Sequence, residues 1–189
     1  MEIESSLSKR KFILSSIVLM VVASIFISQV DAYILRGNRV DRPNQVKYWL
    51  DASISSIGYN AAAIHGSTAW NGLTAGRLSI NVTSTTSASA ADVKWYASSE
   101  TNDLGQFYAQ TSTSGTLTST SIVRINTVRF KTVDGNRQKE TTAHEMGHVL
   151  GLTHEDTVPS IMLSGPAWLY GTYPVQDDKD GIAHIYQFD

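Results

Sequence analysis

The sequence predicts an α/β domain in which a mixed β-sheet packs against helices. Short segments with strand patterning alternate along the chain with segments of helical patterning, and this order is typical of α/β layers. The 189 residues contain no cysteine, so the fold must be stabilised by its core and by bound metal rather than by disulfides. We find no internal repeat.

The predicted elements are spread over the chain from residue 46 onward. Strands are expected at 46–50, 78–82, 92–97, 105–110 and 122–130. Helices are expected at 59–70, which is rich in alanine, around the motif described next, and near 178–186. The serine- and threonine-rich runs 83–89 and 111–121 are expected to be sheet-edge loops that carry no chemistry.

Residues 144–154 match the pattern H-E-x-x-H-x-x-G-x-x-H. His144 and His148 are four residues apart, so on a helix both project from one face. Gly151 stands where a left-handed residue commonly ends a helix, which turns the chain so that His154 can approach the same metal ion. Three imidazole ligands leave one coordination position open, as in a catalytic zinc site.

Glu145 follows the first histidine and is the candidate general base. A structural alternative exists, because Thr142 and Glu145 also fit a capping box in which Glu145 would complete the start of a helix. Ala143, Met146 and Leu150 form an apolar stripe that would anchor a helix here in the core.

The motif and its surroundings resemble the metzincin zinc peptidases, and within them the matrixin branch of the matrix-metalloprotease type. Met162 follows His154 at the distance of the family's Met-turn. Ser164 stands where astacin-like and serralysin-like members carry a tyrosine ligand, which argues against those branches. Residues 176–186 resemble the matrixin closing helix, and residues 33–39 resemble the mature N-terminus.

This resemblance implies a metzincin-type catalytic domain over residues 33–189. Its twisted mixed sheet would pack with an N-terminal helix and the active-site helix, and a C-terminal helix would follow the Met-turn. One catalytic Zn²⁺ ion would be bound by the three histidines of the motif, His144, His148 and His154.

Other residues receive supporting roles from the same resemblance. Met162 would underlie the zinc site without binding the metal. Of the pair Asp177 and Asp178, one would receive the amino group of the mature N-terminus and the other would brace the Met-turn. A solvated helix start, where aspartate is favoured, explains the pair equally well.

Substrate contacts are also implied by the resemblance. In matrixins an edge strand pairs with the substrate backbone, so residues 105–110, with Phe107 and Ala109, are the candidates for substrate alignment. Three aromatic residues are candidates for walls of the primed-side pocket and equally for packing: Trp168, Tyr170 and Tyr173.

The chain departs from animal matrixins at the segment 122–130. That segment lacks the His and Asp residues which hold a structural zinc and calcium ions in those proteins. His65 and His184 are expected on helix surfaces. A Ca²⁺ site has no ligand pattern behind it, although three aspartates are available: Asp92, Asp103 and Asp134.

Residues 1–32 are expected to be a signal peptide. A basic segment at 9–11 precedes the apolar residues 12–27, and small or compact residues end at Ala32. Cleavage there would start the mature chain at Tyr33 and lead to secretion. The alternative is an uncleaved membrane anchor through residues 12–28, somewhat shorter than the roughly 20 residues that a spanning helix needs.

These features predict a secreted zinc-dependent endopeptidase that hydrolyses peptide bonds in proteins or peptides. The alternative is a catalytically inactive binding protein on the same scaffold, but Glu145 and all three histidines of the motif are retained. A net charge of −2 gives no indication of a nucleic-acid partner. We expect a monomer with no stable membrane partner after signal cleavage.

Overall fold

The computed structural model describes residues 36–75, 77–99, 109–113, 117–118, 120–164 and 170–186. The described residues fall within one compact unit, Asp31–Asp189. Several predictions lie outside them: the signal peptide 1–32, and those for residues 33–35, Asp103, residues 105–108 with Phe107, and Trp168. No helix in the described part of the chain has the length and apolar character to cross a bilayer.

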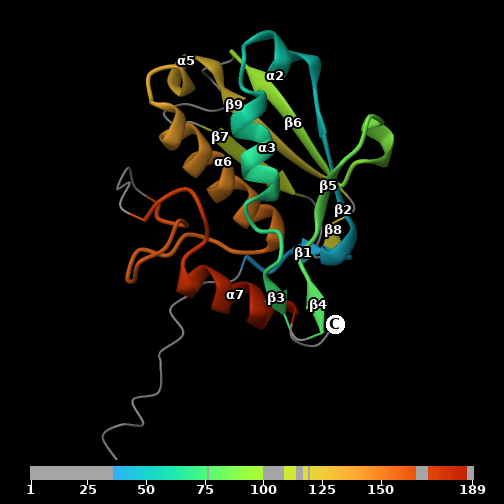
Figure 1. Cartoon of the computed structure of the whole chain (residues 1–189), viewed down its shortest axis with the longest axis vertical. Helices are drawn as coiled ribbons and strands as arrows, with labels where there is room; N and C mark the ends of the chain where they lie inside the picture. Colours follow the sequence, from blue (N-terminus) through green and yellow to red (C-terminus); the bar gives the residue numbers. More distant parts are fainter. Residues whose placement is uncertain are drawn as a thin grey trace, which may run out of the picture. The chain divides into compact units, whose positions relative to one another are not determined.

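A five-stranded mixed sheet, ordered β5-β2-β6-β9-β7, lies at the centre of the fold (Figure 1). Its strands are β2 (Val46–Leu50), β5 (Val82–Ser84), β6 (Val93–Ser98), β7 (Ala109–Thr113) and β9 (Ser121–Asn126). Strands β2, β5, β6 and β9 run parallel, whereas β7 pairs antiparallel with β9 at the sheet edge. The predicted α/β fold with a mixed sheet is therefore confirmed.

Two short ladders accompany the main sheet. Strand β1 (Arg39–Val40) pairs parallel with β8 (Leu117–Thr118). Strand β3 (Thr74–Ala75) pairs antiparallel with β4 (Leu78–Ser79).

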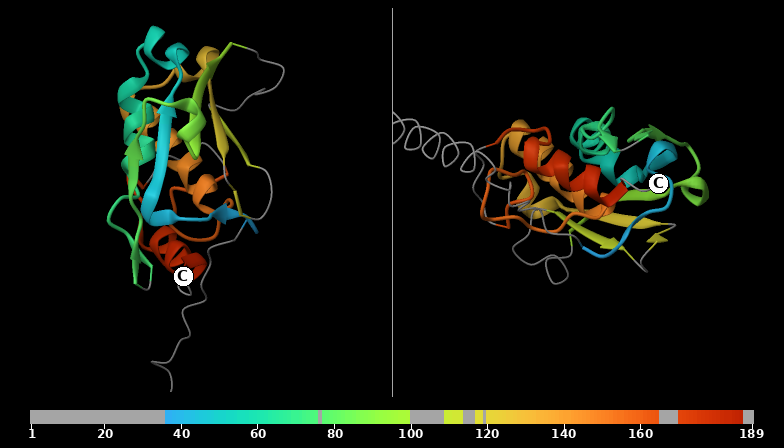
Figure 2. Two further views of the ribbon diagram at one scale, coloured as in Figure 1. Left: turned by 90° about the vertical axis from the view of Figure 1, so that its right-hand side faces the viewer. Right: turned by 90° about the horizontal axis from the view of Figure 1, so that it is seen from below.

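Helices α3 (Asn60–Thr68) and α6 (Gly135–Leu150) lie on one face of the sheet, and α7 (Gln176–Tyr186) lies beyond the strand ends (Figure 2). Alternate strand residues point into this layer, because Val93 and Trp95 on β6 and Val123 and Ile125 on β9 are fully buried. The shorter helical segments are α2 (Ala52–Ser56), α5 (Thr127–Phe130) and two 3-10 turns, Pro43–Gln45 and Ala88–Ala90.

Helices α3 and α6 approach each other closely at Gly66. A Cβ atom at Gly66 would lie 2.5 Å from Cβ and 2.6 Å from the carbonyl oxygen of Thr142, so only glycine allows this separation of the backbones. Thr142 Oγ1 donates a hydrogen bond to the carbonyl oxygen of Ala62 at 2.8 Å. Trp70 Nε1 donates to the carbonyl oxygen of Ala143 at 2.9 Å. The segment that carries the histidine motif is therefore anchored to α3.

Several predicted elements differ from the observed ones. The strand expected at 78–82 is two strands, β4 and β5. The strand expected at 122–130 ends at Asn126, whose Oδ1 accepts hydrogen bonds from the first N–H groups of α5 and so caps a helix. The run 111–121, expected to be a loop, contains the end of β7 and all of β8. In that run, pairing with β1 and β9 outweighs the loop-like composition.

Candidate active site

The histidine motif lies at the C-terminal end of α6. The helix begins at Gly135 and is capped by Asp134, whose side chain accepts a hydrogen bond from the N–H of Arg137 at 2.9 Å. The alternative that a helix begins at Thr142 is therefore wrong. It ends at Gly151, which has a left-handed φ of 107°. A Cβ atom at Gly151 would lie 2.7 Å from the carbonyl oxygen of Asn38. The predicted glycine turn is therefore confirmed.

The turn brings His154 back toward the two helical histidines. One ligand atom from each of His144, His148 and His154 lies within 4.8 Å of the others. Their ring centroids are 4.7, 5.3 and 4.9 Å apart. Among the described residues, this is the one group of three or more His, Asp or Glu side chains that could hold a metal ion.

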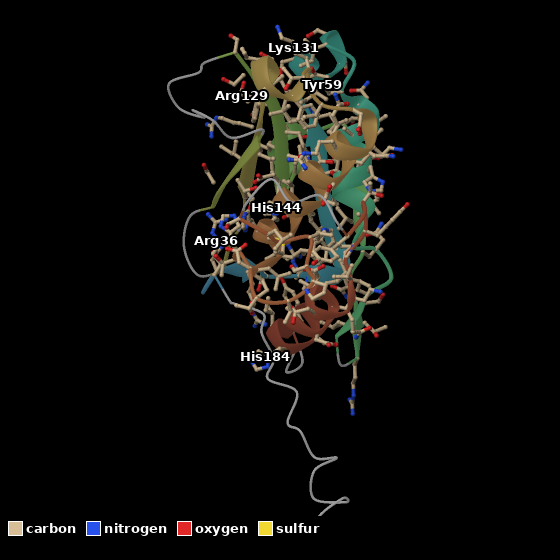
Figure 3. All side chains as sticks on the ribbon, turned by 90° about the vertical axis from the view of Figure 1, so that its left-hand side faces the viewer. Arg36, Tyr59, Arg129, Lys131, His144 and His184 are labelled. Atoms are coloured by element: carbon tan, nitrogen blue, oxygen red, sulfur yellow. The ribbon has the colours of Figure 1, made fainter. Side chains whose placement is uncertain are left out.

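Hydrogen bonds to backbone carbonyls orient two of the rings. His144 Nδ1 lies 2.8 Å from the carbonyl oxygen of Ile161, and His148 Nδ1 lies 2.8 Å from that of Leu152. Because a carbonyl oxygen only accepts, each Nδ1 must carry the proton, and each Nε2 then presents a lone pair. Figure 3 shows the position of His144 on α6.

The surroundings of the three imidazoles favour the neutral form that binds metals. Desolvation by the surrounding protein is the main cause that lowers the pKa of His144, His148 and His154. The pKa values of His148 and His154 are lowered further by neighbouring histidines. Three neutral nitrogen ligands in one cluster, two of them pre-oriented, fit Zn²⁺ with an open fourth position.

Glu145 is buried beside this cluster, with 6% of its surface exposed. Burial raises the pKa of its carboxyl group to about 7, although a hydrogen bond from Thr111 and the charge of nearby Arg36 oppose the shift. A carboxyl group with a pKa near neutrality is suited to accept and release a proton at physiological pH. Arg36 Nη2 donates a hydrogen bond to the carbonyl oxygen of Thr111 at 3.4 Å, which places this charge near Glu145.

A turn at residues 160–162 packs against α6 and contacts His144. Met162 is fully buried, and its side chain packs against Gly147 of α6, where a Cβ atom would lie 3.1 Å from Met162 Cε. The same turn supplies the Ile161 carbonyl oxygen that orients His144. Met162 therefore lies beneath the helix segment that carries His144 and His148.

Asp178 holds this turn in place. Its carboxylate accepts hydrogen bonds from Ser160 Oγ at 2.5 Å, Ile161 N at 3.1 Å and Val175 N at 2.8 Å. Only 1% of its surface is exposed, which differs from a solvated helix start. Burial raises the pKa of Asp178, and the three hydrogen bonds oppose that rise. Asp177 is half-buried in the first turn of α7, and the amino group of Tyr33 lies outside the described residues.

A scan against protein-family models matches the Matrixin peptidase family over residues 90–187, from just before β6 to the end of α7. The chain belongs to the matrixin family. Membership and the three-histidine cluster place this matrixin among the zinc metalloendopeptidases, whose substrates are proteins. A search of curated proteins finds no match.

The other two histidines are not part of the cluster, and the described aromatic candidates have contacts of their own. His65 on α3 contacts the carbonyl oxygen of Thr172 through Nε2 at 2.7 Å and packs edge-on against Tyr173, which is 61% exposed. His184 is exposed on α7 (Figure 3). Tyr170 packs against the core.

The two described aspartates named for calcium have other partners in the structure. Asp92 accepts a hydrogen bond from the backbone N–H of Lys47, and Asp134 caps α6. No Ca²⁺ site is supported by these contacts.

Sequence reasoning missed Thr111, whose hydroxyl lies 2.7 Å from Glu145 Oε2. It also missed the backbone carbonyls of Leu152 and Ile161 as partners of the histidines. Thr111 lies 34 positions before Glu145 in a serine- and threonine-rich run, so no local pattern could have pointed to it.

Proposed function

We propose that this matrixin is a secreted zinc endopeptidase in which Glu145 acts as the general base. His144, His148 and His154 would hold the single catalytic Zn²⁺ ion through their Nε2 atoms. The observation that carries the proposal is the cluster of three imidazoles with the buried carboxyl group of Glu145 near it. When bound, zinc supplies Lewis-acid chemistry: it lowers the pKa of water and polarises a peptide carbonyl.

Glu145 would accept a proton from the attacking water and return it to the nitrogen of the leaving amine. Its pKa of about 7 supports both transfers, because the carboxylate and the acid are then both accessible near neutral pH. Burial excludes competing water from the carboxylate. The proton therefore moves between Glu145 and the reacting groups within a largely dry site.

The substrate would lie along the free edge of β7. Within the described part of the chain, β7 pairs with β9 alone, so one of its edges is available to an extended peptide. Its residues Ala109–Thr113 lie next to Glu145, because Thr111 contacts that side chain. An added peptide strand would thereby pass close to the base.

Met162 and Asp178 would act as supports of the metal site, and Asp177 would receive the amino group of a chain that begins at Tyr33. The contacts of Asp178 with the turn at 160–162 support its role as a support of the metal site. Matrixins are typically extracellular. Cleavage of the signal peptide after Ala32, with secretion of a monomer, remains part of this proposal.

The test uses protein recovered from a secreting host that expresses the full coding sequence. We expect cleavage of casein or a quenched peptide library that stops on chelation and returns with added zinc. Glu145→Gln should retain zinc and lose about 10²–10⁴-fold in turnover. Zinc binding by the wild type without cleavage would instead support the inactive-scaffold alternative.

Two further measurements address secretion and assembly. N-terminal sequencing should begin at Tyr33; a chain that keeps residues 12–28 and stays with membranes would contradict signal cleavage. Light scattering during gel filtration should give the mass of one chain, and a larger mass would contradict the monomer.

A further inference from the structure

Thr111 reaches from the edge strand to the carboxylate of Glu145. Its Oγ1 lies 2.7 Å from Glu145 Oε2 and 3.0 Å from the carbonyl oxygen of the same residue. A hydroxyl has one proton to donate, and the carboxylate oxygen is both the nearer and the stronger acceptor. Both residues are 6% exposed, so little water competes for this contact.

This hydrogen bond restricts the last torsion of the Glu145 side chain. That torsion is broad in glutamate, so packing alone leaves the carboxylate plane weakly defined. The backbone N–H of Thr111 also faces this carboxylate, so two groups of the same residue point at it. The contact with Thr111 therefore orients the plane of the carboxylate.

Thr111 itself is held firmly. It pairs with Val123 in the antiparallel ladder between β7 and β9. As a β-branched residue in a strand, it has few accessible side-chain rotamers. The orientation of the carboxylate is thus set by the same strand along which the substrate is proposed to lie.

We infer that Thr111 is a positioning residue that orients the Glu145 carboxylate for proton transfer during peptide hydrolysis, an inference that rests on the proposed function. Thr111 acts through Glu145 and contacts no reacting atom. Loss of its hydroxyl therefore affects the transition state more than the binding of substrate. A residue that only joined β7 to α6 would instead change folding or KM.

The experiment compares Thr111→Val, which removes the hydroxyl at nearly constant volume, with Thr111→Ser, which keeps it. Both are expressed as the full chain and recovered from the secreting host. We expect Thr111→Val to lower kcat by about 10–100-fold with KM changed less than about threefold, and Thr111→Ser to keep kcat within about threefold of the wild type. Thr83→Val is the matched control, because it is the same substitution at an exposed site on the opposite edge strand, β5.

Two readouts besides activity accompany the kinetics. Zinc affinity, measured by competition with a chromophoric chelator, should be the same in Thr111→Val and the wild type. The urea midpoint of Thr111→Val should be high enough that the variant is fully folded in the assay. If Thr111→Val does not fold, Thr111→Ala and Thr111→Ser form the comparison, with loss of kcat expected only in the alanine variant.

Three results would overturn the inference: wild-type kcat in Thr111→Val, a serine variant as slow as the valine variant, or a rise in KM at constant kcat. The proposed function fails separately. Full activity in Glu145→Gln would refute the role of the base whatever the Thr111 variants do. An inactive Glu145→Gln together with a fully active Thr111→Val would refute only the positioning role.

Discussion

Replacement of Asp178 tests whether the turn at 160–162 depends on a single buried carboxylate. Asp178 accepts hydrogen bonds from the backbone N–H groups of Ile161 and Val175 and from the Ser160 hydroxyl. Asp178→Ala leaves these donors without their acceptor in a site that exposes 1% of the aspartate surface. Each buried unsatisfied group costs about 1–3 kcal/mol, so we expect a loss of about 3–5 kcal/mol in the free energy of unfolding.

Asp178→Asn should be milder. Its one amide oxygen can still accept from the two backbone N–H groups, whereas its NH₂ group would face Ser160 Oγ, which already accepts from the N–H of Met162 at 2.8 Å. One charge-assisted hydrogen bond is lost, and we expect about 1.5–3 kcal/mol. Zinc affinity should fall by about 10–100-fold in Asp178→Ala, because the Ile161 carbonyl that orients His144 is no longer held. The fall should be smaller in Asp178→Asn, which keeps the hydrogen bond from the N–H of Ile161.

The assay is urea denaturation followed by tryptophan fluorescence, with zinc affinity measured by chelator competition. Asp180→Asn is the control on the same helix, because Asp180 accepts a hydrogen bond from the side chain of Gln176 at an exposed position. If Asp178→Ala unfolds at the same urea concentration as this control, the bracing argument is wrong. If stability falls while zinc affinity does not, the coupling between the turn and His144 is wrong.

Three further predictions concern packing, pH and metal. Gly66→Ala should lower the free energy of unfolding by about 1–3 kcal/mol, because the added Cβ would meet the backbone of α6. Gly135→Ala should be neutral or stabilising, because nothing lies within 4 Å of a Cβ atom there. Equal effects of the two substitutions in calorimetry would refute the close approach of the helices. Burial raises the pKa of Glu140 to about 7, so between its ordinary pKa and pH 7 the folded protein binds more protons than the unfolded chain, and stability falls as pH rises. Glu140→Gln should remove this loss and gain about 1–2 kcal/mol at pH 8, after allowance for solvent screening, and nothing at pH 4.5. A gain that does not depend on pH would contradict the assignment. Turnover should fall as pH drops below about 7, because protonated Glu145 cannot accept a proton, and bound zinc should move the midpoint of this fall to lower pH. Chelation should lower the melting temperature, since metal at about 1,000 times its Kd stabilises the folded protein by about 4 kcal/mol.

The local parts of the site could be predicted from the sequence because helix geometry is local. A spacing of four residues puts His144 and His148 on one face of α6, whatever the rest of the chain does. Gly151 ends that helix because a left-handed φ is readily adopted by glycine. The alternation at 46–50 likewise led to the observed β2.

The sequence pattern failed where tertiary contacts outweigh local preference. The β-rich segment 122–130 looks like one strand, but Asn126 caps a helix once β9 reaches the end of its pairing with β6. Residues 111–113 have the composition of a loop, yet they complete an antiparallel pair with β9. Strand propensity depends on the neighbouring strands, which composition does not specify.

By itself, the sequence determined the identity and spacing of the three histidines, the adjacent acid and the glycine that turns the chain. Only the tertiary structure decided what surrounds them: that Ile161, 17 positions away, orients His144, and that Thr111, 34 positions away, contacts Glu145. The physical reason is range. Backbone geometry fixes neighbours within one or two helical turns, whereas burial of a carboxylate and its hydrogen bonds arise only when distant segments pack together.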